Sequence, residues 1–419
     1  MNDPSTADRA IRTRVLLLLL FAYIFNFIDR NIIGVLAVPI REEFNLSDTA
    51  LSTLGVAFGV FYAAIAIPIA WAADRKSRVN IIAGAVALWS LFTAACGIVQ
   101  SYAQLVVARM GVAVGEAGGI APSYSLIADY FPREKRSRAL AFYSLGIPIG
   151  SALGVFFGGW LAAHLSWRSA FLIIGLAGLP AALLIKTLIP EPERGRFDAP
   201  SSPEGMRAGE VASALFRTPS FWLLSFGAAS GSILGYGLIF WLPSFFNRSF
   251  GLALADVGWF YGSIVLVGGV LGTWLGGWLG DRLGPTRPGG YALIPAVCFL
   301  ITAPTFALGL FAPNLWVAWL LFTVGQMLAL AWLGPVITAV QHIVLPSMRA
   351  TASASFLFIN NLIGIAFGIY FLGWMSDTLK AAHGAESLRY SILYGLGFYL
   401  LAAVFYLFAA RRLREDLKS

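Results

Sequence analysis

Long runs of apolar residues, separated by short polar segments, recur along the whole chain. A membrane-spanning helix needs about 20 predominantly apolar residues, and twelve stretches of the chain meet that requirement. We expect spans at 14–38, 50–73, 79–99, 103–130, 139–163, 167–189, 219–246, 254–280, 289–311, 315–342, 351–376 and 387–410. The pattern therefore predicts an all-α integral membrane protein.

The predicted spans fall into two sets of six. The longest polar stretch between them, 191–218, is rich in Pro, Ser and charged residues, as expected of a linker. We therefore expect an amino-terminal six-helix bundle over 1–190 and a carboxyl-terminal one over 219–419. Repeated halves of this kind are typical of rocking transporters, with the binding site near the middle of the membrane.

Composition changes the picture in two respects. Only 12% of the residues are charged and 58% are hydrophobic, whereas a soluble protein has about 25% charged residues. The net charge of +8 does not indicate nucleic-acid binding, because the basic residues cluster between apolar runs. Most of the 29 Lys and Arg residues lie in segments on one side, so we expect both termini in the cytoplasm and a location in the plasma (inner) membrane.

The chain lacks sequence signals of an enzyme. Its three histidines are far apart, none of its lysines follows a glycine as in a phosphate-binding loop, and both cysteines lie in apolar runs. We therefore expect no catalytic residues, no metal and no cofactor. An ATP-driven pump is excluded for this chain alone.

Four ionisable residues interrupt the apolar runs. Asp29 and Arg30 lie in the first span, and Arg109 and Glu116 in the fourth. Charges inside a membrane are costly and usually functional. Arg109 and Glu116 are seven residues apart, so they share a helix face, about 10 Å apart along the axis. We expect one cluster that binds an anionic substrate and a proton; the alternative is a static ion-pair network.

Two loops repeat a Gly-Asp-Arg pattern. After the eighth span, Gly-x-Leu-Gly-Asp-Arg-x-Gly contains Asp281 and Arg282. After the second span, a degenerate copy keeps an acidic and two basic residues: Asp74, Arg75 and Arg78. Asp129 ends the fourth span at the level of Arg78, so we expect these two to pair. Contacts at this face would stabilise an outward-open state; alternatively, the loops only set topology.

Small residues and aromatics suggest packing and lining positions. Gly146, Gly150, Gly154 and Gly158 recur every four residues in the fifth span, as on a flat face for close helix contact. Six residues of the second half are candidates for lining a substrate cavity: Tyr236, Phe240, Trp241, Gln326, Asn360 and Asn361. Residues of these types are also common among side chains that only pack inside a membrane protein.

Several motifs carry a family resemblance. The loop at 277–284 is similar to the signature loop of the major facilitator superfamily. Segments within 20–175 resemble the spinster family, which moves sphingosine-1-phosphate or lysophospholipids: Phe25–Arg30, Arg109–Pro122, Leu126–Phe131, Arg136–Arg138 and Ile147–Ser151. The second half shows little of this resemblance. Organic anion–cation symporters share an Asp-Arg pair in the first helix and an Arg…Glu-Ala in the fourth.

The resemblance and the charges together imply a secondary active transporter that works by alternating access. We expect proton-coupled movement of an anionic amphiphile, such as a lysolipid or sphingoid phosphate, by a protein that functions as a monomer. Its partners would be the lipid or small-molecule substrate, protons and the lipid bilayer, and not nucleic acid. The alternatives are a proton-coupled symporter of small organic anions, such as carboxylates or sugar acids, and a non-transporting membrane receptor or scaffold.

Overall fold

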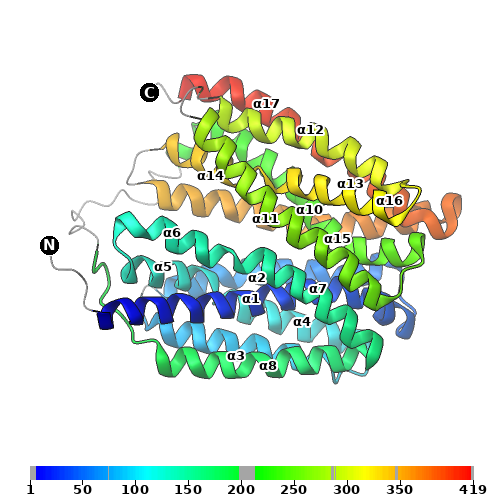
Figure 1. Ribbon diagram of the computed structural model, residues 1–419, viewed down its shortest axis with the longest axis horizontal. Coiled ribbons are helices and arrows are strands. Elements are labelled where there is room, and N and C mark those ends of the chain that lie inside the picture. Colours follow the sequence, from blue (N-terminus) through cyan, green and yellow to red (C-terminus); the bar gives the residue numbers. More distant parts are fainter. Residues whose placement is uncertain are drawn as a thin grey trace. The chain divides into compact units, whose positions relative to one another are not determined.

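The computed structural model describes residues 6–73, 75–197, 213–284, 287, 289–344 and 348–416, and in these residues all regular structure is helical. Asp74 and residues 198–212 of the predicted linker lie outside the described residues. The helices (Figure 1) are α1 (Thr6–Glu43), α2 (Asp48–Ala73), α3 (Arg78–Cys96), α4 (Tyr102–Glu116), α5 (Ile120–Tyr130), α6 (Arg133–Ser144), α7 (Gly146–His164), α8 (Trp167–Leu188), α10 (Pro219–Phe250), α11 (Leu254–Leu283), α12 (Gly290–Leu310), α13 (Leu315–Leu330), α14 (Leu333–His342), α15 (Arg349–His383), the short η2 (Gly384–Glu386), α16 (Ser387–Gly395) and α17 (Gly397–Asp416).

The predicted spans are confirmed. Eleven stretches of the described residues are long and apolar enough to cross a membrane, and the last of them, Ala352–Leu413, contains two predicted spans. Most ends agree with the prediction within a few residues. The first helix is longer than predicted because a polar turn extends it, in which Arg12 Nη2 lies 2.6 Å from Asp8 Oδ2.

Four of the predicted spans, at 103–130, 139–163, 315–342 and 387–410, consist of two helices each. The break between α4 and α5 follows Glu116 directly. There the N–H groups of Gly118 and Gly119 donate to carbonyls three residues back, over 3.0 Å each, so the chain tightens into a turn. Glu116 is therefore the last residue of α4.

The chain divides into two compact units. The first comprises Met1–Asn45, Ala57–Ser202 and Leu254–Trp259, and the second Leu46–Val56, Pro203–Ala253 and Phe260–Ser419. Helix α2 belongs to both, because its first turns pack in the second unit and its remainder in the first.

In the first unit, α1 packs along α7 and α3 along α8, and Figure 1 draws α3 and α8 side by side. The predicted glycine face is present on α7. A Cβ atom on Gly150 would lie 2.5 Å from the carbonyl oxygen of Ile24, and one on Gly154 would lie 2.6 Å from that of Ile28. Only glycine allows the backbones of α1 and α7 to approach this closely.

In the second unit, α10 packs along α15 and α17, and α12 along α17. Its interior is rich in aromatic rings: Phe299 stacks on Tyr399 with ring centroids 5.0 Å apart. The backbones of α10 and α15 also approach closely, because a Cβ on Gly368 would lie 1.9 Å from the carbonyl oxygen of Ile233.

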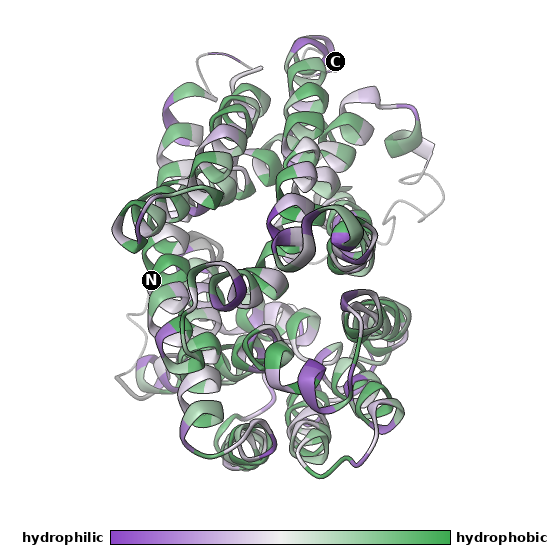
Figure 2. Ribbon diagram, turned by 90° about the vertical axis from the view of Figure 1, so that its right-hand side faces the viewer, coloured by the Kyte–Doolittle hydropathy of each residue, from purple (hydrophilic) through white to green (hydrophobic). Residues whose placement is uncertain are grey.

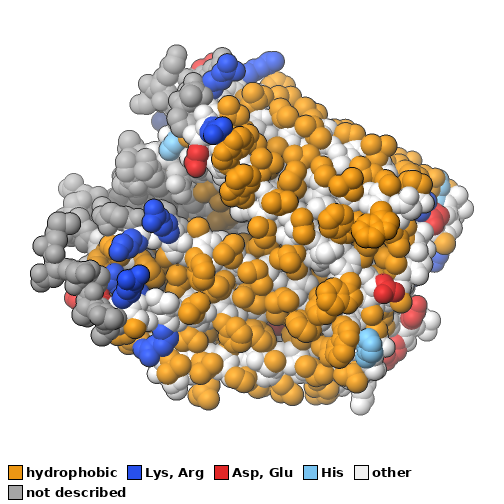
Figure 3. Space-filling view, in the orientation of Figure 1, with side chains coloured by type: hydrophobic (Ala, Val, Ile, Leu, Met, Phe, Trp, Pro, Cys, Tyr) orange, Lys and Arg blue, Asp and Glu red, His pale blue; other side chains and the backbone are white. Residues whose placement is uncertain are grey.

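The outer surface is that of a multi-pass membrane protein. Large apolar side chains such as Leu183, Trp274 and Leu308 are exposed on the helices, which in water would be a liability. Hydrophobic residues colour most of the helix lengths in Figure 2, and hydrophilic residues are concentrated at helix ends and loops. On the face shown in Figure 3, hydrophobic side chains cover the middle, and Lys and Arg gather towards one end.

Candidate functional site: a buried ion-pair cluster

The four predicted intramembrane charges meet in the first unit as two ion pairs. The shorter pair joins α1 to the last residue of α4: Arg30 Nε donates to Glu116 Oε2 over 2.5 Å. The turn after Glu116 ends α4 at this carboxylate. The predicted cluster is therefore present, with Arg30 and Glu116 in direct contact.

The second pair is looser. Arg109 Nη1 lies 3.9 Å from Asp29 Oδ1 and donates to the backbone carbonyl of Asp29 over 3.4 Å. The other carboxylate oxygen, Oδ2, accepts a short hydrogen bond from Thr93 Oγ1 on α3. Asp29 is thus positioned by a neutral donor and a distant cation, whereas Glu116 directly contacts its arginine.

Aromatic rings surround the two arginines. The guanidinium of Arg30 lies 4.6 Å from the ring centroid of Tyr62, 5.5 Å from that of Phe58 and 5.4 Å from that of Phe27. Phe58 also lies 5.1 Å from the guanidinium of Arg109. Rings at these distances attract a cation through their quadrupoles, so they stabilise both arginines without neutralising them.

Solvent exposure separates Arg30 from the other three charges. Its side chain is 13% exposed, whereas those of Asp29 and Arg109 are 3% exposed and that of Glu116 is fully buried. An anion that approaches the cluster would therefore meet Arg30 first. Arginine suits this task, because its planar guanidinium binds phosphate or carboxylate groups with two parallel hydrogen bonds.

A second ion-pair network lies at the other end of α5. The predicted pair of Arg78 and Asp129 is present: Arg78 Nη1 donates to Asp129 Oδ2. Arg78 Nε also donates to Glu191 Oε1 over 2.8 Å, and Gly195 N donates to Asp129 Oδ1 over 3.0 Å. The residues just after α8 therefore fasten onto the loop between α2 and α3, a role that sequence reasoning missed for Glu191.

Glu191 also caps α3. Its Oε2 atom accepts from Val79 N over 2.9 Å and from Ser77 Oγ over 2.8 Å. Burial raises the pKa of the Glu191 carboxyl, but the hydrogen bonds from Val79, Arg78 and Ser77 outweigh it, and the pKa lies below its usual value. Because the folded-state pKa is depressed, this stabilisation is complete above the unfolded pKa of about 4.3 and is lost as the pH falls through the folded pKa.

We expect Glu191→Gln to speed hydrogen exchange of the Val79 amide about threefold at neutral pH, since a charged acceptor is replaced by a neutral one at a partly exposed position. After correction for intrinsic rates, the difference from the wild type should disappear in acid, where Glu191 itself is protonated. Glu193→Gln, two residues away, serves as the control. Equal Val79 exchange in both variants would show that Glu191 does not cap α3.

The other described motif residues lie at exposed positions at or next to helix ends. Asp281 and Arg282 at the end of α11 are exposed, and the Arg282 guanidinium lies 4.4 Å from the Trp278 ring centroid. The guanidinium of Arg75 lies 4.0 Å from the centroid of the Trp71 ring. Asp74 falls outside the described residues. A gating role for these residues stays a prediction.

Four of the six predicted cavity residues carry a hydroxyl or amide group: Tyr236, Gln326, Asn360 and Asn361. Tyr236 is half-buried, and its hydroxyl donates to Asn361 Oδ1 over 3.2 Å. Asn360 accepts from Ser232 Oγ over 2.7 Å, and Gln326 is largely buried against Gly268.

Phe240 and Trp241 require a correction. Both are buried in the packing of the second unit, and Trp241 Nε1 donates to the carbonyl oxygen of Ile369 over 2.9 Å. In this structure they form part of the core and do not line a cavity.

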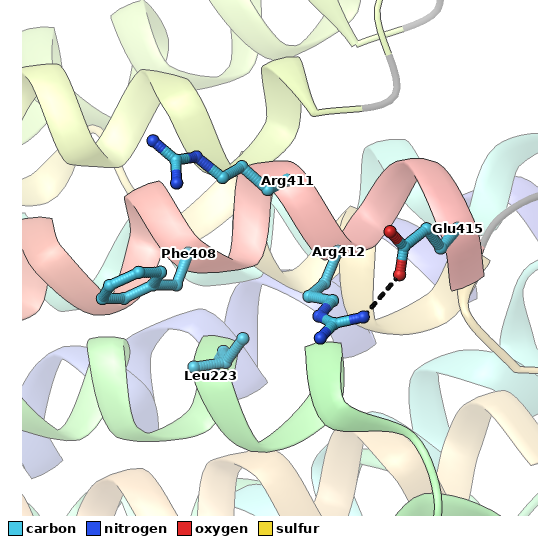
Figure 4. A pocket seen from close by; sticks show the side chains of 5 residues that line it. All are labelled: Leu223, Phe408, Arg411, Arg412 and Glu415. Atoms are coloured by element: carbon cyan, nitrogen blue, oxygen red, sulfur yellow. Dashed lines mark hydrogen bonds and ion pairs between the residues drawn. The ribbon is translucent and has the colours of Figure 1, made fainter.

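A surface pocket in the second unit does not belong to the cluster. Figure 4 shows its lining on α10 and α17: Leu223, Phe408, Arg411, Arg412 and Glu415. The guanidinium of Arg412 is paired with Glu415 at 2.7 Å. None of the four intramembrane charges lines this pocket.

Many helices long and apolar enough to cross a membrane, with two pairs of charges buried among those of the first unit, are the features of a membrane transporter. The chain belongs to the Major Facilitator Superfamily, whose sequence model matches residues 19–369, and within it to the spinster family.

Three relatives support this assignment. An "MFS-type efflux pump" of Mycolicibacterium smegmatis is 35% identical over 396 residues, covering 94% of this chain and 91% of that protein. "Protein spinster homolog 1" of Xenopus laevis is 28% identical over 425 residues, covering 93% and 80%. The crystal structure of a bacterial homolog of the human lysosomal transporter Spinster, in an inward-facing and unoccupied conformation, has a TM-score of 0.86 and 31% identity over 99% of both chains.

Proposed function

We propose that this transporter carries an anionic amphiphile together with a proton, and that Arg30 is the residue at which the two are coupled. The observation that supports this most strongly is the pair formed by a partly exposed arginine and a fully buried carboxylate, 2.5 Å apart. Arg30 can reach a ligand, whereas Glu116 can reach only Arg30 and its buried neighbours.

The coupling follows from the energetics of a buried charge. A ligand phosphate or carboxylate that binds Arg30 must compete with Glu116 for the same guanidinium. Once displaced, Glu116 would be a buried carboxylate without a close partner, which costs several kcal/mol. Protonation removes that cost. Binding of the anion and of the proton are therefore cooperative, and by linkage each strengthens the other to the same degree.

Asp29 and Arg109 have a positioning role in this scheme. The backbone carbonyl of Asp29 accepts from Arg109 Nη1, and its side chain accepts from Thr93. These contacts tie α1 to α3 and α4 immediately beside Arg30. They hold the guanidinium of Arg30 at the height of Glu116.

The substrate class is proposed from the resemblance to spinster proteins and from the apolar surroundings of Arg30. Phe27, Phe58 and Tyr62 place rings beside the guanidinium, where the first carbons of a lipid chain would follow the headgroup. A lysolipid or sphingoid phosphate combines the required anion with a chain that gains about 0.8 kcal/mol for each buried methylene.

Affinity should therefore rise steeply with acyl length in a series of lysophosphatidic acids, measured with the purified protein by thermal shift and by equilibrium binding. Arg30→Ala should weaken every member of the series by a similar factor, because it removes only the headgroup contact. Lys186→Ala, which removes a cation from the end of α8, is the matched control.

A flat dependence on chain length, or tighter binding of lactate-sized acids, would contradict the lipid assignment. It would favour the small organic anions that the same arginine could bind. Uptake into proteoliposomes, with and without a pH gradient, separates either transporter from a receptor or scaffold.

The orientation is part of the proposal. The excess of Lys and Arg at one set of loops favours cytoplasmic termini in a plasma (inner) membrane. In that orientation the network of Arg78, Asp129 and Glu191 lies at the cytoplasmic end of the spans, where the predicted gating contacts would act. A single chain contains the whole cluster, so we propose that the protein functions as a monomer.

A further inference from the structure

A shallow pocket lies on the outer surface of the first unit, at the polar start of α1. Its volume is about 650 Å³, and its described lining residues all come from α1: Arg9, Ala10, Thr13, Arg14, Leu17 and Leu18. It is remote from the charge cluster, because Arg14 precedes Arg30 by 16 positions, or about 24 Å along the helix. The pocket is therefore not part of the proposed transport site.

The lining residues form two adjacent columns on one face of α1, because positions four apart lie one above the other on a helix. The first column is Arg9, Thr13 and Leu17, and the second is Ala10, Arg14 and Leu18. The first column continues into Phe21. The side chain of Leu17 is 50% exposed and that of Phe21 is 42% exposed. Along α1 this surface thus changes from cationic to apolar.

The two arginines of the pocket carry charge that no neighbouring acid compensates. Both are exposed, and neither has a carboxylate partner among the residues that the structure describes. The nearest acid in the sequence, Asp8, is engaged elsewhere: its Oδ2 lies 2.6 Å from Arg12 Nη2, and its Oδ1 lies 3.9 Å from Arg196 Nη1. The pocket therefore combines two unpaired guanidiniums with an apolar wall.

This combination matches an amphiphile that carries its negative charge at one end. A guanidinium binds a phosphate group through two parallel hydrogen bonds. Ala10, with its short side chain, lies between Arg9 and Arg14 in the sequence and leaves room for such a group. Leu17 and Phe21 follow on the side of the apolar span, so the order along α1 is that of a headgroup and its acyl chain.

We propose that the start of α1 binds an anionic phospholipid of the bilayer, with the phosphate held by Arg9 and Arg14 and one acyl chain along Leu17 and Phe21. A lipid with a net negative charge is favoured over a zwitterionic one, because the ammonium of the latter would be repelled by the two guanidiniums. The proposal concerns the surface of the transporter that faces lipid. It rests neither on the proposed substrate nor on proton coupling.

The pocket on α10 and α17 provides a comparison within the same molecule (Figure 4). It also contains two arginines and two apolar residues, but the guanidinium of Arg412 is paired with Glu415 at 2.7 Å. An anion in that pocket would approach a carboxylate as well as the arginines. We therefore expect it to bind an anionic lipid more weakly than the start of α1.

The test uses the full-length protein, purified in a mild detergent, with phosphatidylglycerol as the probe and phosphatidylcholine as the zwitterionic reference. Native mass spectrometry measures the ratio of lipid-bound to lipid-free protein at a fixed lipid concentration. Arg9→Gln and Arg14→Gln should each lower the ratio for phosphatidylglycerol about fivefold, and the double variant should lower it more than about tenfold. The ratio for phosphatidylcholine should be lower in the wild type and should change little in the variants.

Two control backgrounds accompany these variants. Arg411→Gln combined with Arg412→Gln makes the same change in net charge at the other pocket and should leave the ratio for phosphatidylglycerol nearly unchanged. In an Arg30→Ala background, the double substitution at Arg9 and Arg14 should cause the same fold-loss as in the wild type, because the pocket is separate from the charge cluster. This result would stand even if the proposed substrate were wrong.

Inorganic phosphate in excess should displace little of the bound phosphatidylglycerol, since it lacks the apolar contacts. Folding is checked by size-exclusion profile and thermal unfolding, and if the double variant does not fold, the two single variants decide. Equal losses in the Arg9/Arg14 and Arg411/Arg412 variants would mean that net charge alone attracts the lipid, and would overturn the site. Displacement by inorganic phosphate, or equally strong binding of phosphatidylcholine, would overturn the assignment to an anionic phospholipid.

Discussion

Glu116→Gln is expected to abolish the pH dependence of anion binding and of transport while preserving strong binding. In the wild type, an ionised Glu116 holds Arg30 at 2.5 Å and competes with the ligand. The amide of Gln carries no charge, so it cannot compete in the same way at any pH. The variant should bind the anion at neutral pH as tightly as the wild type does in acid, and a pH gradient should no longer drive its uptake.

The direction in which anion affinity changes with pH distinguishes co-transport with a proton from exchange against one. As the pH falls, wild-type Glu116 takes up a proton, Arg30 is released, and affinity for the anion rises by at most tenfold per pH unit for a single coupled proton. This slope is measured by equilibrium binding of a lysophosphatidic acid at a series of pH values. The affinities are corrected for the change in the ligand's own charge with pH. A proton exchanger would show the reverse, with affinity falling on acidification.

Asp29→Asn is the matched control, because it removes the other buried carboxylate and leaves the contact between Arg30 and Glu116 in place. The hydrogen bond from Thr93 can be kept by the amide oxygen of Asn. We expect weaker binding but an unchanged slope with pH. If instead Asp29→Asn removes the slope and Glu116→Gln keeps it, Asp29 is the proton carrier, and the competition for Arg30 is not the coupling step.

The number and position of the spans could be predicted from the sequence because the bilayer imposes a single strong requirement. Each span needs about 20 apolar residues, and the chain has few charges that blur the boundaries. The breaks inside four spans were not predictable in this way. Hydropathy is insensitive to a tightened turn such as 117–119, since Ala and Gly suit a helix inside a membrane and a turn alike.

The charged members of the site were predictable for the opposite reason. Asp29, Arg30, Arg109 and Glu116 are conspicuous because a charge inside a membrane is costly. Their neutral partners were missed. Thr93 and Tyr62 are common span residues, and only the packing of α2 and α3 against α1 brings them to the charges.

Residues near the ends of spans gave no signal of their own. Glu191, for example, looks like part of a polar linker in the sequence. Their roles depend on which helix ends meet, which no local pattern records. Phe240 and Trp241 were misassigned for a related reason: an aromatic residue in a span has the same hydropathy whether it lines a cavity or fills the core.

Gly154→Val is expected to destabilise the protein more than any other single change considered above. The first atom of the new side chain would lie 2.6 Å from the carbonyl oxygen of Ile28 and 2.9 Å from its Cα. Both atoms are backbone, so no side-chain rotation can relieve the clash, and α7 must move away from α1. Overpacking of this kind costs about 3 kcal/mol, and more where the backbone has to shift.

The displacement also reaches the charge cluster, because Ile28 immediately precedes Asp29 and Arg30. We therefore expect Gly154→Val to lower the thermal unfolding midpoint and, in the fraction that folds, to weaken anion binding. Gly84→Val is the matched control: it makes the same change inside α3 of the same unit, where a Cβ would meet nothing within 4 Å. Its effect should be limited to helix propensity, which favours Val over Gly by less than about 1 kcal/mol. Equal unfolding midpoints for the two variants would mean that α1 and α7 can separate at Gly154 without loss of stability. The contact between α1 and α7 at Gly154 would then not be what holds Asp29 and Arg30 in position.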